Sequence, residues 1–132
     1  MKGWFSYLLS CCDGSLYSGF TVDMPRRLSL HNAGKGARYT AGHRPVRLSA
    51  LWQWPDRHAA MSAEALVKRL SRDRKIQLVR SPGAIGDFIG LTPIRAFSSG
   101  ELEAIQSQSE GNRSASPGVG QQDDVDNRPI ML

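Results

Sequence analysis

The feature that most constrains the fold is a predicted β-hairpin near the start of the chain. Two mainly apolar segments, residues 4–11 and 15–21, flank the turn sequence Asp13-Gly14. An Asp-Gly pair between apolar runs is a strong hairpin signal, because glycine adopts the positive φ that tight turns require. We therefore expect two antiparallel strands joined by a short loop.

The length of this loop decides where two tyrosines point. A two-residue loop would place Tyr7 and Tyr17 on opposite faces of the sheet, because side chains alternate along a strand. A three-residue loop with Gly14 in a left-handed bulge pairs Cys11 with Ser15 and puts both tyrosines on one face. Only the second register builds a site, so the turn and the function form a single prediction.

Helix caps and breaks set out the elements that follow the hairpin. Asp23, Asp56 and Ser71 are N-cap residues, and a glycine-rich segment at 33–37 ends the first helix. The predicted elements are a helix over 25–32, a strand over 46–54, a helix over 57–70 and a short helix to about 79. The order is therefore β-β-α-β-α-α, and the fold class is α+β.

The composition changes near residue 80. Residues 1–80 are assigned to one compact domain, and residues 81–97 form an extension of uncertain structure. Residues 98–132 are polar and acidic with few apolar side chains, so we predict a disordered tail.

The charge is distributed unevenly along the chain. Residues 1–80 carry 14 Lys and Arg against 5 Asp and Glu, a net charge of +9, whereas residues 81–132 carry 3 against 7, a net charge of −4. A basic domain suits a polyanion, since each cation that neutralises a phosphate releases a counterion. A solvated basic surface without a nucleic-acid partner remains the alternative.

The N-terminal segment allows a second interpretation. Lys2, the apolar run over 4–9 and Cys11 resemble a short lipoprotein signal, which would make the chain a lipid-anchored envelope protein. A secretory signal usually needs roughly 15–30 residues, more than this segment offers. The only two cysteines, Cys11 and Cys12, are adjacent and cannot staple distant segments, so we expect a cytoplasmic protein without a membrane span.

Two further pairs have the spacing of neighbours on a helix. Arg27 and His31 lie at i and i+4, and so do Glu64 and Lys68. Taken singly, the first pair fits an ordinary basic surface and the second an ordinary surface ion pair. The ordered set of two tyrosines, an arginine, a histidine and a glutamate is more informative.

Residues 4–79 resemble small stand-alone bacterial proteins of the GIY-YIG nuclease family. The resemblance runs through the hairpin, the Arg27-to-His31 helix, the segment 34–40, the segment 44–48 and the segment 64–71. It implies a small three-stranded antiparallel sheet flanked by helices. The chain departs from the family at Phe5-Ser6, which replaces Gly-Ile, and at Ser18, which replaces the central Ile of the second motif.

The resemblance implies a role for each matching residue. Glu64 would bind a single divalent metal, Mg²⁺ or Mn²⁺, because hard cations prefer oxygen ligands. Arg27 would bind the phosphoryl oxygens, and His31 would support Tyr7 or the phosphate. Tyr7 would act as the general base and Tyr17 would position the water or phosphate, although which tyrosine is the base stays open.

These roles predict a metal-dependent endonuclease acting on DNA, with single-stranded, branched or damaged DNA as candidate substrates and with DNA preferred over RNA. The alternative is a nucleic-acid-binding module that keeps the fold without turnover, and a lipid-anchored protein is the remote one. Further basic residues would follow the nucleic-acid backbone: Lys35, Arg38, Arg44, Arg47 and Lys68.

Overall fold

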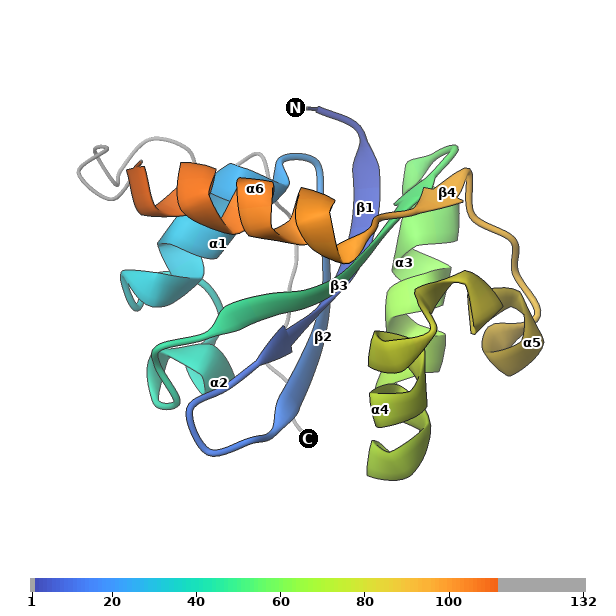
Figure 1. Ribbon diagram of the computed structural model, residues 1–132, viewed down its shortest axis with the longest axis horizontal. Helices are drawn as coiled ribbons and strands as arrows, with labels where there is room; N and C mark the ends of the chain where they lie inside the picture. Colours follow the sequence, from blue (N-terminus) through green and yellow to red (C-terminus); the bar gives the residue numbers. More distant parts are fainter. Residues whose placement is uncertain (1, 112–132) are drawn as a thin grey trace.

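The structure, a computed structural model, describes residues 2–111. In this part of the chain the strands form one antiparallel sheet in the order β2-β1-β3-β4 (Figure 1). The strands are β1 (Trp4–Ser10), β2 (Leu16–Thr21), β3 (Arg47–Trp54) and β4 (Arg95–Ala96). The helices are α1 (Met24–Asn32), α2 (Arg38–Ala41), α3 (Arg57–Lys68), α4 (Arg72–Arg80), the 3₁₀ turn η1 (Pro82–Ala84), α5 (Ile85–Ile89) and α6 (Ser99–Gly111). The α+β class and the helix-flanked antiparallel sheet are confirmed.

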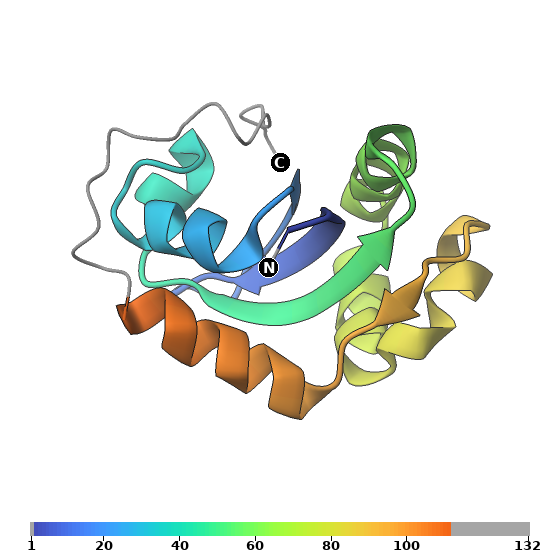
Figure 2. The same cartoon turned by 90° about the horizontal axis from the view of Figure 1, so that it is seen from above.

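Helices cover both faces of the sheet. Helices α1, α2 and α6 lie on one side, and α3, α4 and α5 on the other (Figures 1 and 2). Alternation along β1 follows this division, because Tyr7 and Leu9 pack with α1 residues while Leu8 packs with α3 residues. We call these the α1 face and the α3 face. Each face has its own apolar core, so every strand residue of β1 from Phe5 to Leu9 is buried.

The predicted caps begin the helices as expected. Asp23 accepts a hydrogen bond from the Arg26 amide at 3.3 Å and so begins α1. The Asp56 carboxylate accepts from the Ala59 amide at 2.9 Å at the start of α3, and the Ser71 hydroxyl accepts from the Arg74 amide at 3.2 Å at the start of α4. Local sequence therefore determines where these three helices begin.

Gly34 ends α1. Its φ of +80° is a left-handed conformation that favours glycine. The Lys35 amide donates to the Leu30 carbonyl at 2.8 Å and the Gly34 amide to the His31 carbonyl at 3.1 Å. This is the bond pattern of a Schellman motif, which satisfies the last carbonyls of the helix. The chain then turns back over α1 instead of continuing away from it.

The sheet has a fourth strand that the sequence-based expectation of three strands lacks. Strand β4 pairs with β3 through Ala96 opposite Trp52 and Arg95 opposite Gln53. Two residues are too few to show an alternating pattern, so the strand gives no signal of its own. The extension over 81–97 thus contributes η1, α5 and a strand on the free edge of β3.

The prediction of disorder from residue 98 is wrong for residues 99–111, which form α6. The remainder of the predicted tail, residues 112–132, lies outside the described part. Helix α6 buries one apolar side chain, Ile105, together with the polar Gln106 and Ser109. Gln106 Oε1 accepts from the Leu48 amide at 2.9 Å, so a hydrogen bond to β3 replaces the apolar stripe that sequence analysis looks for.

A local signal for α6 was nonetheless present. The Glu101 amide donates to Ser98 Oγ at 3.2 Å, and the Ser98 amide donates to Glu101 Oε1 at 2.8 Å. This reciprocal pair is a capping box, whose Ser-x-x-Glu pattern marks a helix start. The polar composition outweighed this signal in the prediction.

The N-terminal strand lies in the middle of the sheet. Strand β1 pairs with β2 on one side and β3 on the other, and Cys11 is buried in the core of the α1 face. This placement conflicts with the lipoprotein interpretation, which needs the same segment as a signal. Among the described helices, none combines the length and the hydrophobicity of a membrane span.

Candidate active site

The hairpin adopts the register that places both tyrosines on the α1 face. The Cys11 amide donates to the Ser15 carbonyl at 2.9 Å, and Gly14 has a φ of +87°. Leu9 lies opposite Tyr17 across the strand pair. The predicted three-residue loop with a left-handed Gly14 is therefore confirmed, and Tyr7 and Tyr17 belong to the same core.

A chain of hydrogen bonds links Tyr7 to α2 through His31. Tyr7 Oη lies 2.8 Å from His31 Nε2, and His31 Nδ1 lies 2.7 Å from Thr40 Oγ1. Thr40 Oγ1 donates its single proton to the Ala37 carbonyl at 3.1 Å, so it accepts from His31 Nδ1. Neutral His31 thus carries its proton on Nδ1 and presents Nε2 to the Tyr7 hydroxyl as an acceptor.

His31 is held in the neutral form. Burial, together with the charge of Arg27, keeps the pKa of His31 well below its ordinary value of 6.5. The side chain is 0% exposed, so the protonated form would lose its hydration. At neutral pH the imidazole is therefore unprotonated on Nε2, and this nitrogen accepts the hydrogen bond of the Tyr7 hydroxyl.

Two glycines make room for this arrangement. A Cβ on Gly19 would collide with the Tyr7 phenol, because the ring crosses β2 at the residue opposite. A Cβ on Gly36 would collide with the His31 ring and would lie 2.9 Å from the His31 Cα. Gly36 therefore lets the 34–37 loop cover the imidazole, a requirement that sequence reasoning did not assign to it.

Arg27 and Tyr17 complete the α1 side of the site. Arg27 lies one turn before His31 on α1 and is 6% exposed. The Tyr17 ring meets the His31 ring edge-on, with centroids 5.5 Å apart and planes inclined by 65°. The Tyr7, Tyr17, Arg27 and His31 side chains thus come from β1, β2 and α1 to one face of the sheet.

Glu64 comes from the other face. It lies on α3, is 6% exposed, and its Oε2 is 2.9 Å from the Lys68 ammonium. Ser18 Oγ donates to the Glu64 carbonyl at 3.0 Å and ties α3 to the edge strand β2. Glu64 and the other four residues thus flank β2 from opposite sides.

The departures from the family motif also have partners on the α3 face. Ser18 holds α3 as described, and Ser6 Oγ accepts a hydrogen bond from Trp54 Nε1 at 2.8 Å. Both serines are buried. Ser6 and Ser18 therefore lie on the face away from Tyr7 and His31, whereas Phe5 belongs to the same core as Tyr7.

Glu64 has the character of a magnesium ligand. Among the described residues it is the only buried carboxylate, and no group of three or more potential metal ligands occurs there. Mg²⁺ commonly uses one or two carboxylates together with water and substrate phosphates, so a single glutamate fits such an ion.

The predicted backbone-binding residues occupy different surroundings. Lys35, Arg38 and Arg44 are exposed around the α1–α2 connection. Arg47 is paired with Glu103 of α6 at 3.0 Å, and Lys68 with Glu64.

Basic residues that sequence reasoning missed lie near the α3 side and the hairpin turn. Burial, together with the charge of Lys68, lowers the pKa of Lys75 on α4. Arg72 Nη1 donates to the Gly14 carbonyl at 2.7 Å.

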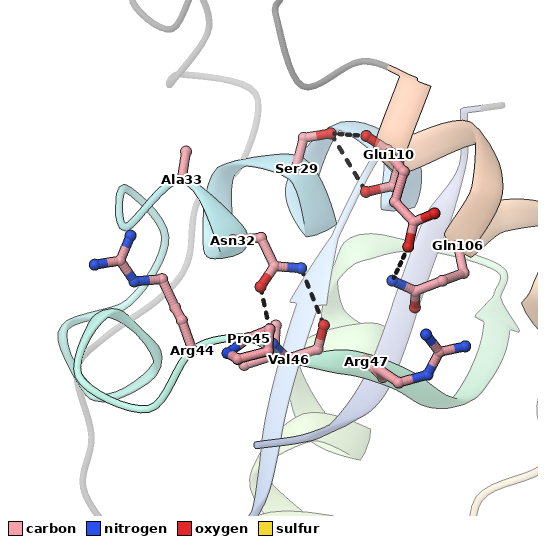
Figure 3. Close-up of a pocket in the computed structure, with 10 residues that line it drawn as sticks. Ser29, Asn32, Ala33, Arg44, Pro45, Val46, Arg47, Gln106 and Glu110 are labelled. Atoms are coloured by element: carbon pink, nitrogen blue, oxygen red, sulfur yellow. Dashed lines mark hydrogen bonds between the residues drawn. The ribbon is translucent and has the colours of Figure 1, made fainter. Parts of the chain in front are cut away.

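A separate pocket of about 870 Å³ opens between α1, residues 44–47 and α6 (Figure 3). On α1 it is lined by Ser29 and Asn32, which point away from Arg27 and His31 at 3.6 residues per turn. Asn32 is held there by two hydrogen bonds to Val46. The pocket therefore does not belong to the tyrosine–histidine cluster.

Comparison with known proteins shows the family of this chain. A family model described as the GIY-YIG catalytic domain matches residues 3–77. The UPF0213 protein BH0048 of Halalkalibacterium halodurans is 49% identical over 79 residues, which is 60% of this chain and 84% of that protein. A UPF0213 protein of Streptococcus pneumoniae is 51% identical over 71 residues, 54% of this chain and 72% of that protein.

A solution NMR structure of the UPF0213 protein BH0048 from Bacillus halodurans, 49% identical, matches 58% of this chain and 82% of that one with a TM-score of 0.39. Strand β4 and helix α6 follow α4 in the chain and lie outside the matched residues 3–77. From the family match over more than half of its length, this chain belongs to the GIY-YIG family of nucleases.

Proposed function

We propose that this protein is a metal-dependent endonuclease that hydrolyses phosphodiester bonds in DNA. The single observation that carries the proposal is the hydrogen bond between Tyr7 Oη and the acceptor nitrogen of a neutral His31. A free phenol has a pKa of roughly 10 and is a poor base at neutral pH. A neutral imidazole within hydrogen-bond reach gives the phenolic proton a destination.

The chemistry follows from the positions of these groups. As a water molecule attacks phosphorus, its proton passes to Tyr7 Oη and the Tyr7 proton passes to His31 Nε2. The new P–O bond forms while the bond to the leaving 3′ oxygen breaks, and that oxygen takes up a proton from solvent. Arg27 binds the phosphoryl oxygens, and Tyr17 orients the water or phosphate.

Glu64 would hold Mg²⁺ or Mn²⁺. When bound, the ion supplies stabilisation of the charge on the phosphate and the leaving oxygen. Lys68 neutralises the Glu64 carboxylate in the absence of an ion. The exposed cations Lys35, Arg38 and Arg44 would follow the DNA backbone, with Arg47 extending their track.

The proposal includes the setting of the reaction. The free thiols of Cys11 and Cys12 suit a reducing cytoplasm, and an activity of this kind would serve DNA repair. DNA is preferred to RNA as the partner.

A supercoiled plasmid incubated with Mg²⁺ or Mn²⁺ tests the proposal. The wild-type chain should nick the plasmid, and chelation of the metal should stop it. Glu64→Gln should remove nicking while leaving DNA affinity similar, because it deletes one carboxylate from a basic surface. Asp87→Asn, which changes an exposed carboxylate on α5, is the control and should nick normally.

One observation favours the second candidate, a binding module without turnover. Tyr7 is 1% exposed and Arg27 6%, so water and phosphate need access that the described conformation restricts. Such a module would bind the plasmid without nicking it under any metal condition. That result would replace the first proposal with the second.

A further inference from the structure

A row of aromatic rings leads from the candidate active site to the protein surface. The Tyr17 ring, which meets His31 edge-on, lies nearly parallel to the Tyr39 ring, with planes 10° apart and centroids 6.4 Å apart. Tyr39 in turn lies parallel to His43, with planes 11° apart and centroids 4.1 Å apart. We call Tyr17, Tyr39 and His43 the aromatic row. Tyr39 belongs to α2, and its hydroxyl reaches Ser15 at the end of the β1–β2 turn.

The outer rings are fixed in place by polar contacts. Tyr39 Oη donates to Ser15 Oγ at 2.8 Å, which ties α2 to the hairpin. His43 Nδ1 donates to the Tyr39 carbonyl at 2.7 Å, and His43 Nε2 lies 3.5 Å from Asp13 Oδ2. Both ring nitrogens of His43 therefore face partners, and the ring plane is set before any ligand arrives.

The row ends at solvent, beside the carboxylate of Asp13. The His43 side chain is 32% exposed, in contrast to the buried Tyr17. Arg38 and Arg44, on either side of His43 in the chain, are exposed. An ordered planar ring at the surface has the makeup of a stacking site for one base, and Arg38 and Arg44 are exposed cations that could neutralise a phosphate.

We propose that the aromatic row is a stacking subsite for an unpaired nucleobase, with His43 as the ring that meets the base. This inference rests on the proposed function, and it names single-stranded DNA, or the unpaired part of a branched DNA, as the substrate class. A base in a duplex is stacked between its neighbours and has no free face to offer. An unpaired base would stack on His43 and so extend the row outward from Tyr39.

Binding without metal isolates the subsite from the chemistry. The full chain is titrated, in a chelator, into a fluorescein-labelled oligothymidylate and into a strand of equal length built from abasic spacers. Fluorescence anisotropy reports both affinities. Stacking contributes ~1–3 kcal/mol per base, so the wild type should bind the base-bearing strand about tenfold more tightly than the abasic strand.

Variants test whether the His43 ring causes the difference in affinity between the base-bearing and abasic strands, expressed as the ratio of the two affinities. His43→Ala should bring the ratio close to one, and His43→Phe should keep it, because phenylalanine retains a ring. Arg38→Ala should weaken both strands equally and leave the ratio unchanged, as expected of a phosphate contact. Thermal melting establishes that each variant is folded, and the wild-type ratio decides the matter if His43→Ala does not fold.

The two proposals fail separately. Equal wild-type affinity for the two strands, or an unchanged ratio in His43→Ala, overturns the stacking subsite whatever the cleavage assay shows. A retained ratio without metal-dependent nicking overturns the nuclease proposal and leaves the subsite as part of a binding module.

Discussion

On the α1 face of the sheet, neutral hydrogen bonds join a buried imidazole to a phenol, whereas on the α3 face a buried carboxylate is paired with an ammonium group. His31 is kept neutral by burial, but Glu64 keeps Lys68 at 2.9 Å. In the proposed function, the α1 face would move a proton and the α3 face would hold a cation. The edge strand β2 lies between the two groups.

The largest effect on nicking is expected from removing the Tyr7 hydroxyl on the α1 face. Tyr7→Phe removes the hydroxyl that joins water to His31, and it should lower the nicking rate by about 10²–10⁴-fold, the usual contribution of a general base. DNA affinity should change little, because the hydroxyl is buried. Tyr17→Phe is the matched variant and should lose less, so a larger loss there would reassign the base to Tyr17.

A methyl group at Gly36 should disturb the same face through its packing. Gly36→Ala drives a Cβ into the His31 ring and backbone, and it should cost about 1–3 kcal/mol of unfolding free energy, as overpacked sites do. Chemical denaturation measures this. Gly83→Ala adds the same methyl where no atom lies within 4 Å, and it should be close to neutral. Equal stability of the two variants would contradict the close cover over His31.

Stability should fall with acid because of His31. Its pKa is lowered on folding, so below about pH 6.5 the unfolded chain binds a proton that the native chain excludes. The unfolding free energy should therefore decrease by up to about 1.4 kcal/mol for each pH unit below that value. Thermal melts from pH 7 to pH 5 measure the slope. His31→Gln should flatten it, whereas the exposed His58→Gln should leave it unchanged.

The smallest effect is expected on the α3 face, where the Glu64–Lys68 pair sets the affinity for a metal ion. Lys68→Met removes the ammonium that competes for Glu64, so Mn²⁺ affinity should rise by about threefold, which corresponds to ~0.7 kcal/mol. Titration calorimetry measures this without any cleavage. Lys35→Met, a matched loss of one exposed cation beside α1, should leave Mn²⁺ affinity unchanged. A weaker affinity in Lys68→Met would show that the lysine supports the carboxylate instead of competing for it.

Local chemistry explains most of what could be predicted. The caps Asp23, Asp56 and Ser71 and the left-handed Gly34 act within a few residues of themselves, so their effects can be read along the chain. Strand β4 and helix α6 resisted prediction because their stability depends on distant partners. A two-residue strand exists only because β3 presents an open edge, and α6 is held by Gln106 against β3 and by Ser109 against Ser29 of α1.

The candidate site also combines features that could be predicted from the sequence with features that could not. The resemblance to the family named Tyr7, Tyr17, Arg27, His31 and Glu64. Turn chemistry allowed two hairpin registers, and the structure adopts the one that a shared site requires. The protonation state of His31 could not be predicted, because it depends on Thr40 from α2 and on burial under the Gly36 loop. The sequence also did not predict that Glu64 lies across β2 from the tyrosines, or that His43 stacks on Tyr39.

By itself, the sequence determined the family, the longer elements from β1 to α4 and the residue types available for chemistry, since periodicity, caps and turns act over short distances. Only the tertiary structure decided which proton donor meets which acceptor, which charge is desolvated and which rings face each other. Those properties arise when segments far apart in the chain exclude water from one another, and the 2.8 Å contact between Tyr7 and His31 is the clearest case.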